Sequence, residues 1–458
     1  MSKLCVVGGG LSGLEFALHA AIKGKRVHIY EAGPSLRKKH VNFDTRKLAG
    51  DEKKRHWTSD ENWGLGGGIS ERLGGRSLCY HGVMIPIEDE ALSSWPVAWR
   101  RILTGEKGLY RQVSNLLSQS YPEMSRKQKE GTQLSHTPQA AKLTDDGKFF
   151  AYSPLYSLES FLNDGVITIE RANIAKISQS TDGFYLTDNQ GKTVNRSGFS
   201  KCVLATSAIV NNAIIANSIE KSFSSKITDH YCLGIFVKVD GGKPVGEFRH
   251  QMIWTGYSEH HDLSSNIFVL ERPRAEDGDR ILEFMAVMEQ SPLHSDLSQL
   301  NCHYSGGKAS LKIDSHHSKS DIDIFNKIAK RLVAFASEVL GVELKPLTGS
   351  VEVESSGKFF KSSGKDIRWD EYNHSLDTLN TTEQSNVYSR FSLPYGSFEH
   401  ESCCHAIGSE GPSALTEELE LTTMPGVYAI GPGAFPRLGI ANPALTICAV
   451  SRWLASNI

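Results

Sequence analysis

The first thirty residues show a regular order of apolar and turn-forming positions. An apolar run at 3–7 predicts a buried strand, and it leads into the glycine-rich run GGGLSG at 8–13. An Ala- and Leu-rich stretch that reaches Lys23 predicts a helix, and residues 26–30 predict a second strand that ends at Glu31. Strand, glycine turn, helix and strand in this order indicate a parallel βαβ unit.

The same order of elements continues after a long interruption. Further strands are predicted at 166–170 and 202–205, with a hairpin over 184–194 and an apolar segment at 208–216. The Ser-, Gln- and Lys-rich stretch 104–150 is interpreted as an insertion. Near the end of the chain, residues 427–431 predict one more buried strand, followed by a glycine loop and a helix over 445–455.

Between about 225 and 400 the pattern changes to long extended runs. Residues 232–239, 266–270 and 281–287 predict strands, and 321–340 predict one helix. These runs indicate a separate β-rich layer. The Ser-, His- and Lys-rich stretch 301–320 is predicted to be a solvated loop, with His316 and His317 at the surface rather than acting as ligands.

Composition and charge narrow the class of protein. The 458 residues allow two to four folding units, and 39% hydrophobic with 22% charged residues are typical of a globular protein. A net charge of -2 gives no reason to expect a nucleic acid or an anionic membrane surface as a partner. We find no apolar run of about 20 residues and no signal-peptide pattern, so we predict a cytoplasmic protein without membrane association.

The eight cysteines carry no pattern of a disulfide scaffold or a zinc site. They are scattered and lack the C-x-x-C spacing. We therefore expect reduced, mostly buried thiols and no metal. The adjacent Cys403 and Cys404 leave a redox role open.

The first glycine run has the spacing of a dinucleotide-binding turn. Of Gly8, Gly10 and Gly13, one allows the tight turn, one lets the backbone approach a pyrophosphate, and one lets the helix pack on the strand. The free N–H groups at the helix start suit phosphates. Glu31 follows 18 residues after Gly13, where a carboxylate accepts hydrogen bonds from ribose hydroxyls. The expected cofactor contacts are Gly8, Gly10, Leu11, Ser12, Gly13 and Glu31.

This first unit does not show whether the expected cofactor is FAD or NAD, but the rest of the chain does. Five segments occur in one order: residues 8–31, LGGRSLCYHG at 73–82, CVLATS at 202–207, HESCCHAIG at 400–408, and 431–446 with its Asn442-Pro443. In these segments the chain resembles the glucose-methanol-choline (GMC) family of FAD-dependent oxidoreductases. The stretch 225–400 matches only diffusely, through Asp229-His230.

The resemblance implies a fold class and a division into domains. The fold class is α/β: an FAD-binding Rossmann-type domain with a doubly wound, mostly parallel sheet, and a second α+β substrate domain built on an antiparallel sheet. We assign residues 1–224 and 401–458 to the FAD-binding domain, with the insertion near 104–150. Residues 225–400 form the predicted substrate-binding domain.

The resemblance also implies cofactor contacts beyond the first unit. The family's Gly-Gly-x-Ser turn lines the flavin, although a simple surface turn is the alternative. A strand like 166–174 clamps the adenine, and some members attach FAD through a histidine near the turn, which makes His81 a candidate. The implied contacts are Gly74, Gly75, Ser77, Ile174, Ala205, Gly431, Pro443 and Thr446.

The family's catalytic pair is a histidine base and a second residue that hydrogen-bonds the substrate oxygen. His400 aligns with the base and Asn442 with the second residue. A neutral imidazole has a reference pKa near 6.5, which suits it to take the alcohol proton as hydride leaves for flavin N5. Spacing to Gly408 favours His400 over His405. The helix that starts near Thr446 should point its N-terminus at the flavin ring.

The sequence departs from the family in three places. Cys403-Cys404 replaces a Gly-Thr pair, Ser207 replaces a common glycine, and residues 431–433 replace an Asp-containing turn. The first departure lies beside the predicted base, so it leaves the identity of the substrate open.

These features predict an FAD-dependent oxidoreductase that oxidises an alcohol to a carbonyl, with O2 or another electron acceptor reoxidising the flavin. The alternatives are a flavoprotein of the same fold with lyase-type chemistry, a steroid or fatty alcohol substrate, and a nucleotide-binding regulatory module. Aromatic residues among polar ones favour a sugar or aminocyclitol hydroxyl, although aromatics in such a layer are more often core. These aromatic residues are Phe236, Trp254, Tyr257, Phe268, Trp369 and Tyr372.

Overall fold

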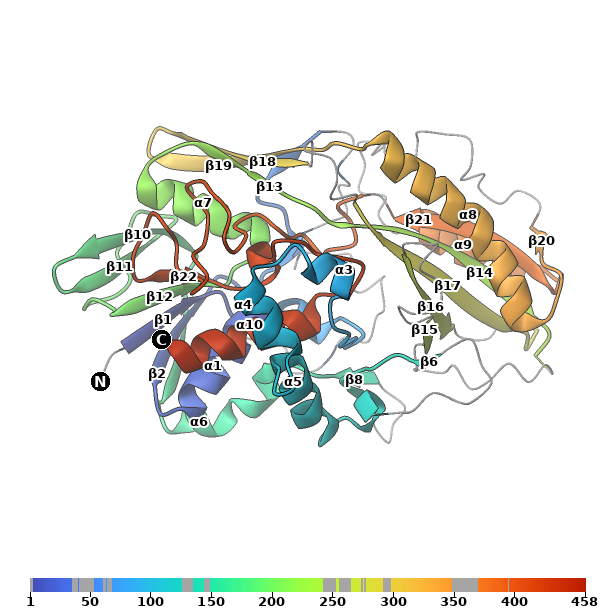
Figure 1. The fold of residues 1–458 in the computed structure, drawn as a ribbon, viewed down its shortest axis with the longest axis horizontal. Helices are drawn as coiled ribbons and strands as arrows, with labels where there is room; N and C mark the ends of the chain where they lie inside the picture. The colour runs from blue at the N-terminus through green and yellow to red at the C-terminus, as the bar shows by residue number, and fades with distance from the viewer. Residues whose placement is uncertain are drawn as a thin grey trace.

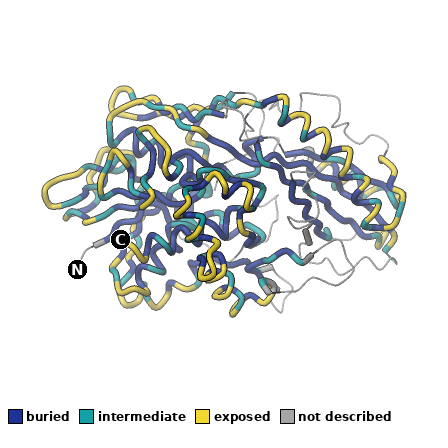
Figure 2. The backbone as a smooth tube through the Cα atoms, in the orientation of Figure 1, coloured by how far each residue is buried: buried dark blue, intermediate teal, exposed yellow. Residues whose placement is uncertain are grey.

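The computed structural model places a parallel sheet with its helices beside a larger antiparallel sheet (Figure 1). Two large hydrophobic cores lie in these two parts, and the buried backbone runs through both (Figure 2). The structure describes residues 3–34, 40, 53–60, 63, 68–125, 135–143, 149–241, 253–254, 265–272, 275, 277–290, 298–347, 370–393 and 395–458.

The parallel sheet contains the strands that the apolar runs predict. Its order is β22-β12-β1-β2-β9, and every neighbouring pair is parallel. Val6 at the centre of β1 pairs with Val203 on one side and Ile29 on the other, so three fully buried side chains share a row. The bounds are β1 (Lys3–Val7), β2 (Arg26–Glu31), β9 (Ile167–Arg171), β12 (Lys201–Leu204) and β22 (Val427–Ala429).

Helices cover this sheet on both sides. In Figure 1, α1 (Leu11–Ile22) and α10 (Ala444–Asn457) lie together below the sheet, and α7 (Ala208–Ile219) lies above it. α10 begins at Ala444, slightly before the predicted start. Smaller helices follow the second glycine turn: η1 (Gly75–Leu78), α3 (Asp89–Leu92), α4 (Val97–Thr104), α5 (Leu109–Ser118), η2 (Pro122–Ser125), η3 (Pro154–Ser157) and α6 (Glu159–Asn163).

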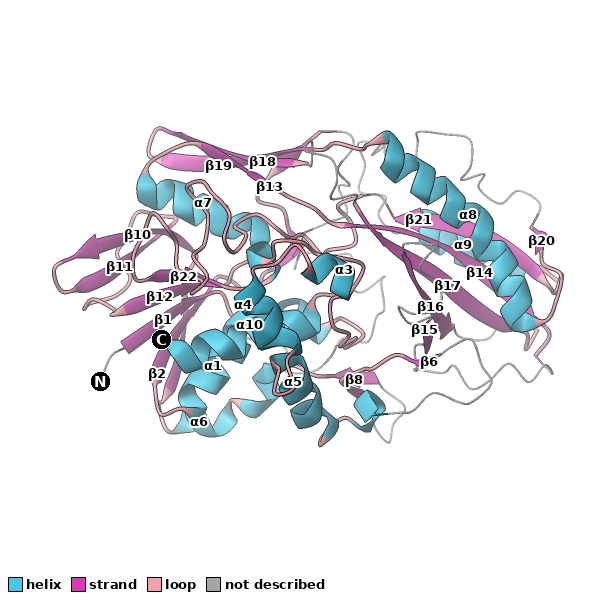
Figure 3. Ribbon diagram, viewed as in Figure 1, coloured by secondary structure: helices cyan, strands magenta, loops and turns pink. Residues whose placement is uncertain are grey.

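Within the described residues the antiparallel sheet has seven strands, of which only β20 and β21 pair in parallel, and two helices pack against it (Figure 3). α8 (Lys319–Leu340) starts at a capping box between Ser318 and Asp321 and contacts the two central strands, β14 and β17. α9 (Asp370–Thr381) contacts β14 and β21. In sheet order the strands are β20 (Lys345–Pro346), β21 (Val387–Leu393), β14 (His230–Val239), β17 (Arg280–Glu289), β16 (Ser265–Glu271), β15 (Ile253–Trp254) and β6 (Ser135–His136).

The predicted loop at 301–320 is wrong over most of its length. β18 (Gln299–Ser305) and β19 (Lys308–Asp314) pair there. On their outer sides they pair with β13 (Phe223–Lys226) and β4 (Thr58–Ser59), respectively. Every second residue of β19 is buried, and the lysines and serines between them hid that period. His316 is exposed as expected, but His317 is half-buried and its Nδ1 lies 2.8 Å from the Tyr231 hydroxyl.

The hairpin predicted over 184–194 is present, but it is not the main pairing of its first strand. β11 (Gly183–Asp188) pairs mainly with the preceding strand, β10 (Ile174–Ser180). Residues 192–194 fold back on β11 through an isolated bridge between Thr187 and Thr193 and a hydrogen bond from the Val194 N–H to the Leu186 carbonyl at 2.9 Å. The predicted turn at 188–191 does exist, because Asp188 N–H donates to the Lys192 carbonyl. The remaining short strands are β3 (Lys53–Lys54), β5 (Ile69–Ser70), β7 (Ala141–Leu143) and β8 (Phe149–Ala151).

The predicted domain boundaries remain a prediction. Two strands from the first 150 residues join sheets formed mainly by 225–400: β4 pairs with β19, and β6 pairs with β15. Within the described residues, no helix has the length and hydropathy needed to cross a membrane. All eight cysteines are buried, and burial raises the thiol pKa of both Cys403 and Cys404.

Candidate active site

One cavity of about 560 Å³ lies where the parallel sheet meets the antiparallel one. Residues from many separate stretches of the chain line it, and they include most of the predicted site. The predicted residues in its wall are Gly8, Gly10, Leu11, Ser12, Glu31, Gly75, Ser77, Ile174, Ala205, His400, Asn442 and Pro443. Four other predicted residues do not line the cavity: Gly13, Gly74, Gly431 and Thr446.

The first glycine turn divides its tasks among three glycines. Gly8 has a φ of +107°, and a Cβ there would lie 2.5 Å from the Ala205 carbonyl oxygen. A Cβ on Gly13 would lie 2.0 Å from the Gly8 oxygen. A Cβ on Gly10 would meet no described atom within 4 Å, although Gly10 lines the cavity. Gly8 and Gly13 are therefore required by the protein itself, whereas the space in front of Gly10 is left open.

The second glycine turn packs directly against the first. Gly74 N–H donates to the Gly9 oxygen at 2.8 Å, and a Cβ on Gly75 would lie 3.1 Å from the Gly10 Cα. The Ser77 hydroxyl donates to the Gly74 oxygen at 2.6 Å and lies 2.7 Å from the Ser153 hydroxyl. The Ser77 side chain therefore stabilises the turn.

Glu31 lies in the cavity wall, but backbone groups already engage its carboxylate. Oε2 accepts the Gly9 N–H at 2.7 Å, and Oε1 accepts the Gly33 N–H at 2.9 Å. Burial raises the pKa of Glu31, and these two hydrogen bonds oppose the rise. The carboxylate thus fixes the first glycine turn from the end of β2, and its contact with a ribose remains a prediction.

The carboxylate of Asp229 holds the backbone of the segment that carries His400. Its backbone N–H donates to Asp229 Oδ1 at 3.0 Å, and the Glu399 N–H donates to Oδ2 at 3.2 Å. Burial and the nearby Glu401 carboxylate raise the pKa of Asp229 to about 8, against these hydrogen bonds. Burial, then His230 and Arg76, keep the pKa of His400 well below its ordinary value, so its imidazole is neutral near pH 7.

Arg76 connects the second glycine turn to the His400 segment, and the sequence analysis missed it. Its two Nη atoms donate to the Glu401 carboxylate at 2.7 and 3.0 Å, and Nη1 also donates to the Glu399 oxygen at 2.6 Å. This bidentate pair has the planar geometry that arginine and carboxylate favour. An arginine in the turn and acids flanking His400 were the available signal.

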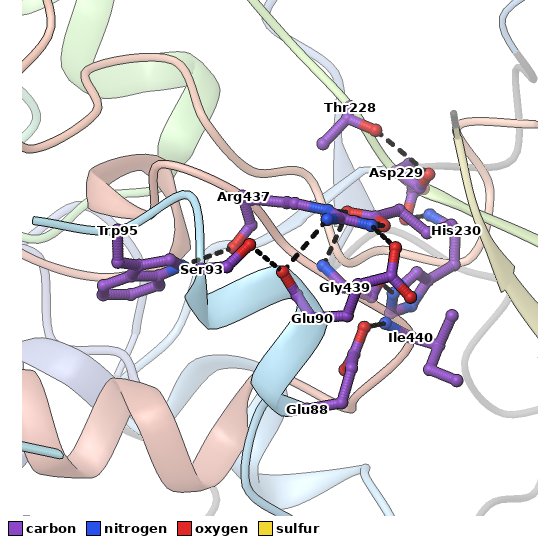
Figure 4. Close-up of polar contacts among 11 residues, drawn as sticks. Glu88, Glu90, Ser93, Trp95, Thr228, Asp229, His230, Arg437, Gly439 and Ile440 are labelled. Carbon is purple, nitrogen blue, oxygen red and sulfur yellow. Dashed lines mark hydrogen bonds and ion pairs between the residues drawn. The ribbon is translucent and has the colours of Figure 1, made fainter. Parts of the chain in front are cut away.

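The ring of His400 contacts a second histidine. Its Nδ1 lies 2.8 Å from Nδ1 of His230, which is buried at the start of β14. Nε2 of His230 lies 2.8 Å from the Gly439 carbonyl oxygen. Figure 4 shows His230 beside the loop that carries Gly439 and Ile440.

Buried carboxylates hold that loop in place. Glu289 accepts the Gly439 N–H at 2.7 Å and pairs with Arg437. Glu88 accepts the Ile440 N–H at 2.9 Å (Figure 4). Burial is the main cause that raises the pKa of Glu88 to about 7. These two adjacent backbone N–H groups therefore each have their own carboxylate acceptor.

Asn442 follows this loop at the start of α10. Its side-chain Oδ1 is buried and makes no hydrogen bond with the described residues, although Asn442 lines the cavity. Pro443, Ala444 and Ile447 line the cavity beside it, so the first turn of α10 faces the same space. Thr446 is fully buried outside the cavity wall, and its hydroxyl lies 2.9 Å from that of Tyr110, so its contact with the cofactor remains a prediction.

The two other candidate histidines occupy different environments. His405 is buried away from the cavity wall, and neither of its ring nitrogens has a hydrogen-bond partner in the described structure. Its ring packs against Gly433, where a Cβ would lie 2.2 Å from its Cε1. His81 lies in the cavity wall, and burial lowers its pKa to about 3. The geometry thus brings His400, rather than His405, to the cavity.

The antiparallel sheet contributes an apolar wall with one ionic cluster. Arg272 Nε donates to Glu283 Oε2 at 2.6 Å, and the Tyr372 hydroxyl donates to the same oxygen at 3.1 Å. Around this cluster the wall is formed by Phe268, Leu270, Met285, Leu393 and Phe398.

The predicted aromatic residues have different positions. Phe268 and Tyr372 reach the cavity, whereas Phe236 is core and stacks near Phe391. The strand β15 contains Trp254, whose side chain is outside the described part of the structure. Tyr257 and Trp369 also lie outside the described residues.

Comparison with known proteins places the fold. No family model matches the sequence, and no curated protein sequence matches it. Solved structures do match over the whole chain. Pyridoxine 4-oxidase from Mesorbium loti has a TM-score of 0.60 at 13% identity, covering 100% of this chain and 99% of its own.

A second solved structure agrees with the first. An FAD-dependent oxidoreductase from Chaetomium thermophilum, in complex with a small fragment, has a TM-score of 0.63 at 11% identity and covers 100% and 98% of the two chains. The chain therefore has the fold of these flavin-dependent oxidoreductases, and the resemblance seen in the sequence is confirmed at the level of the fold.

Proposed function

We propose that this protein is an FAD-dependent oxidoreductase that oxidises an alcohol to a carbonyl compound. The observation that carries the proposal is the shared cavity, because both glycine turns line it together with His400 and Asn442. Two glycine turns suited to a dinucleotide, a histidine suited to accept a proton and an amide suited to orient an oxygen thus face one space. The shared fold with an oxidase and with another FAD-dependent oxidoreductase supports it.

The residues present fit FAD. The open space at Gly10 adjoins the first turn of α1, whose N-cap residue offers no side chain to its N–H groups. Such a turn provides donors for a pyrophosphate. At the other end of the cavity, Asn442 Oδ1, which has no partner among the described residues, and the start of α10 offer polar groups to a ring system.

When bound, FAD supplies the acceptor for the hydride that leaves the alcohol carbon. In this proposal His400 takes the hydroxyl proton, because burial keeps its ring neutral near pH 7. The carboxamide of Asn442 orients the substrate oxygen. The N-terminal end of α10 stabilises negative charge nearby.

Arg76 has a supporting role in the proposed reaction. It fixes the carboxylate of Glu401 and the carbonyl of Glu399, which flank the base. Arg76 also belongs to the second glycine turn. The contact of this turn with the cofactor and the position of the base His400 therefore both depend on the Arg76–Glu401 ion pair.

For the substrate we propose a compact alcohol with further polar groups, of the sugar or aminocyclitol type. The Arg272–Glu283–Tyr372 cluster supports this, because a steroid or a fatty alcohol would remove water from these charged and polar groups and offer no hydrogen bonds in return. The apolar residues around the cluster suit one face of a ring. O2 or another acceptor would complete the cycle.

The test is to purify the protein, release its cofactor by denaturation and then follow flavin absorbance anaerobically with a panel of alcohols. The panel includes sugars, aminocyclitols, pyridoxine, a sterol and a fatty alcohol. We expect one FAD per chain and bleaching by at least one polar alcohol. A protein that binds NAD but no flavin would contradict the cofactor assignment, and flavin that no alcohol reduces would favour lyase-type chemistry.

A further inference from the structure

We propose that His230 is a positioning residue that fixes the proton of His400 on Nδ1 and leaves Nε2 as the basic nitrogen. The inference rests on the proposed role of His400 as the base. It concerns a contact that lies outside the predicted catalytic pair, namely the 2.8 Å approach of two Nδ1 atoms.

The direction of the hydrogen bonds follows from the Gly439 carbonyl. A carbonyl oxygen only accepts, so Nε2 of His230, 2.8 Å away, must carry a hydrogen. A neutral imidazole has one N–H, and Nδ1 of His230 is therefore an acceptor. The short contact between the rings then requires the hydrogen to lie on Nδ1 of His400.

Both rings remain neutral over the relevant pH range. Burial lowers the pKa of His230 to about 4, and burial and His230 hold that of His400 well below its ordinary value. With its hydrogen on Nδ1, His400 presents an unprotonated Nε2. That nitrogen makes no hydrogen bond to any residue that the structure describes, and His400 lines the cavity.

The Gly439 carbonyl oxygen, which accepts the first hydrogen bond of this series, is held in place without help from the histidines. Glu289 and Glu88 hold the backbone N–H groups of Gly439 and Ile440, and the Asn266 side chain donates to the Ile440 oxygen at 2.6 Å. The backbone N–H of His230 itself donates to Asp229 Oδ1 at 2.7 Å. The Gly439 oxygen and His230, which lie side by side in Figure 4, are therefore preorganised for the contact with His400, which completes the relay.

The same relay suits the protonated base. When Nε2 of His400 takes the substrate proton, Nδ1–H keeps its hydrogen bond to His230, and no group in the relay has to rotate. Fixing a base by its second ring nitrogen is a known means of holding one tautomer.

The direct test is nitrogen NMR on the flavin-loaded protein with 15N-labelled histidine, in which His400 is assigned by the signals lost in His400→Ala. In the wild type we expect a protonated Nδ1 and an unprotonated Nε2 on His400 at pH 7. In His230→Leu we expect this tautomer to lose its exclusive population. His230→Asn, whose side-chain oxygen replaces the Nδ1 acceptor, should restore it.

Anaerobic flavin reduction gives a second readout on the same variants. We expect His230→Leu to slow reduction by about 10–100-fold, as when the outer partner of a functional histidine is removed, with FAD retained. His230→Asn should recover most of the rate, and the control His405→Leu should change neither the rate nor the His400 signals. Because wild type and the Asn variant are informative by themselves, a poorly folded Leu variant does not remove the test.

Two results would overturn the inference: a wild-type His400 with its hydrogen on Nε2, or a tautomer that is unchanged in His230→Leu. Both are separable from failure of the proposed function. If no alcohol reduces the flavin but His400 carries its hydrogen on Nδ1, the relay stands and alcohol oxidation does not. If His400→Ala abolishes reduction but the tautomer is wrong, the function stands and the relay does not.

Discussion

The two ends of the cavity are built in different ways. At the glycine end, backbone groups of β1, α1 and the second turn approach one another, and only small residues allow it. At the histidine end, side chains from distant segments meet, and Asp229, His230 and Gly439 each fix part of the position of His400. The glycine end therefore depends on local backbone geometry, and the histidine end depends on long-range contacts.

The largest expected effect lies at the glycine end. Gly10→Val should abolish FAD retention, because the valine side chain would fill the space that a pyrophosphate needs in front of the glycine turn. The protein should stay folded, because Gly10 has a φ of -80° that valine tolerates and no described atom lies near its Cβ position. The measurement is flavin absorbance after purification together with the thermal melt of the protein.

The matched control is Gly24→Asn just beyond the other end of α1. Gly24 has a φ of +78°, which asparagine tolerates, and open space around it. This variant should keep its flavin. Normal flavin content in Gly10→Val would show that the glycine turn does not approach a cofactor.

The next effect tests the histidine end. His400→Ala should retain FAD but reduce the rate of substrate-driven flavin reduction by about 10²–10⁴-fold, the usual contribution of a positioned base. His405→Ala should cost much less, because His405 lies outside the cavity wall. The reverse result would place the base at His405 and require a different alignment around Cys403 and Cys404.

Asn442 should show a somewhat smaller effect. Asn442→Ala should keep its flavin and lose about 2.7–4 kcal/mol of transition-state stabilisation, by analogy with other single hydrogen-bond groups at a reacting oxygen. Asn457→Ala, at the exposed far end of α10, is the control. Stopped-flow flavin reduction measures both, and equal rates in the two variants would move the second catalytic role to another residue.

The difference between the two ends also explains what the sequence could reveal. The glycine turn, β1, α1, β2 and Glu31 are contiguous, so spacing alone predicted their arrangement. Arg76 and His230 carried no periodic signal, because their partners lie hundreds of residues or many strands away. The strands β18 and β19 were missed for a different reason. Polar residues occupy their exposed positions, and only a few residues of each strand are buried, so the apolar period is short.

The smallest effect concerns the contribution of His405 to the pH dependence of the free energy of unfolding. Burial lowers the pKa of His405 to about 3, whereas an unfolded chain has a histidine pKa near 6.5. Below pH 6.5 the unfolded state therefore binds the extra proton, and the free energy of unfolding falls as the pH falls. The share of His405 is about 2 kcal/mol between pH 6.5 and pH 5.

His405→Leu should remove this share without slowing flavin reduction. Both ring nitrogens of His405 are buried without partners in the described structure, so an apolar side chain of similar size leaves no new polar group unpaired. Urea unfolding at pH 7 and pH 5 should show a smaller loss of stability in the variant than in the wild type. An equal loss in both proteins would mean that His405 is protonated in the folded state, and its buried environment would then have to contain an acceptor for the charge.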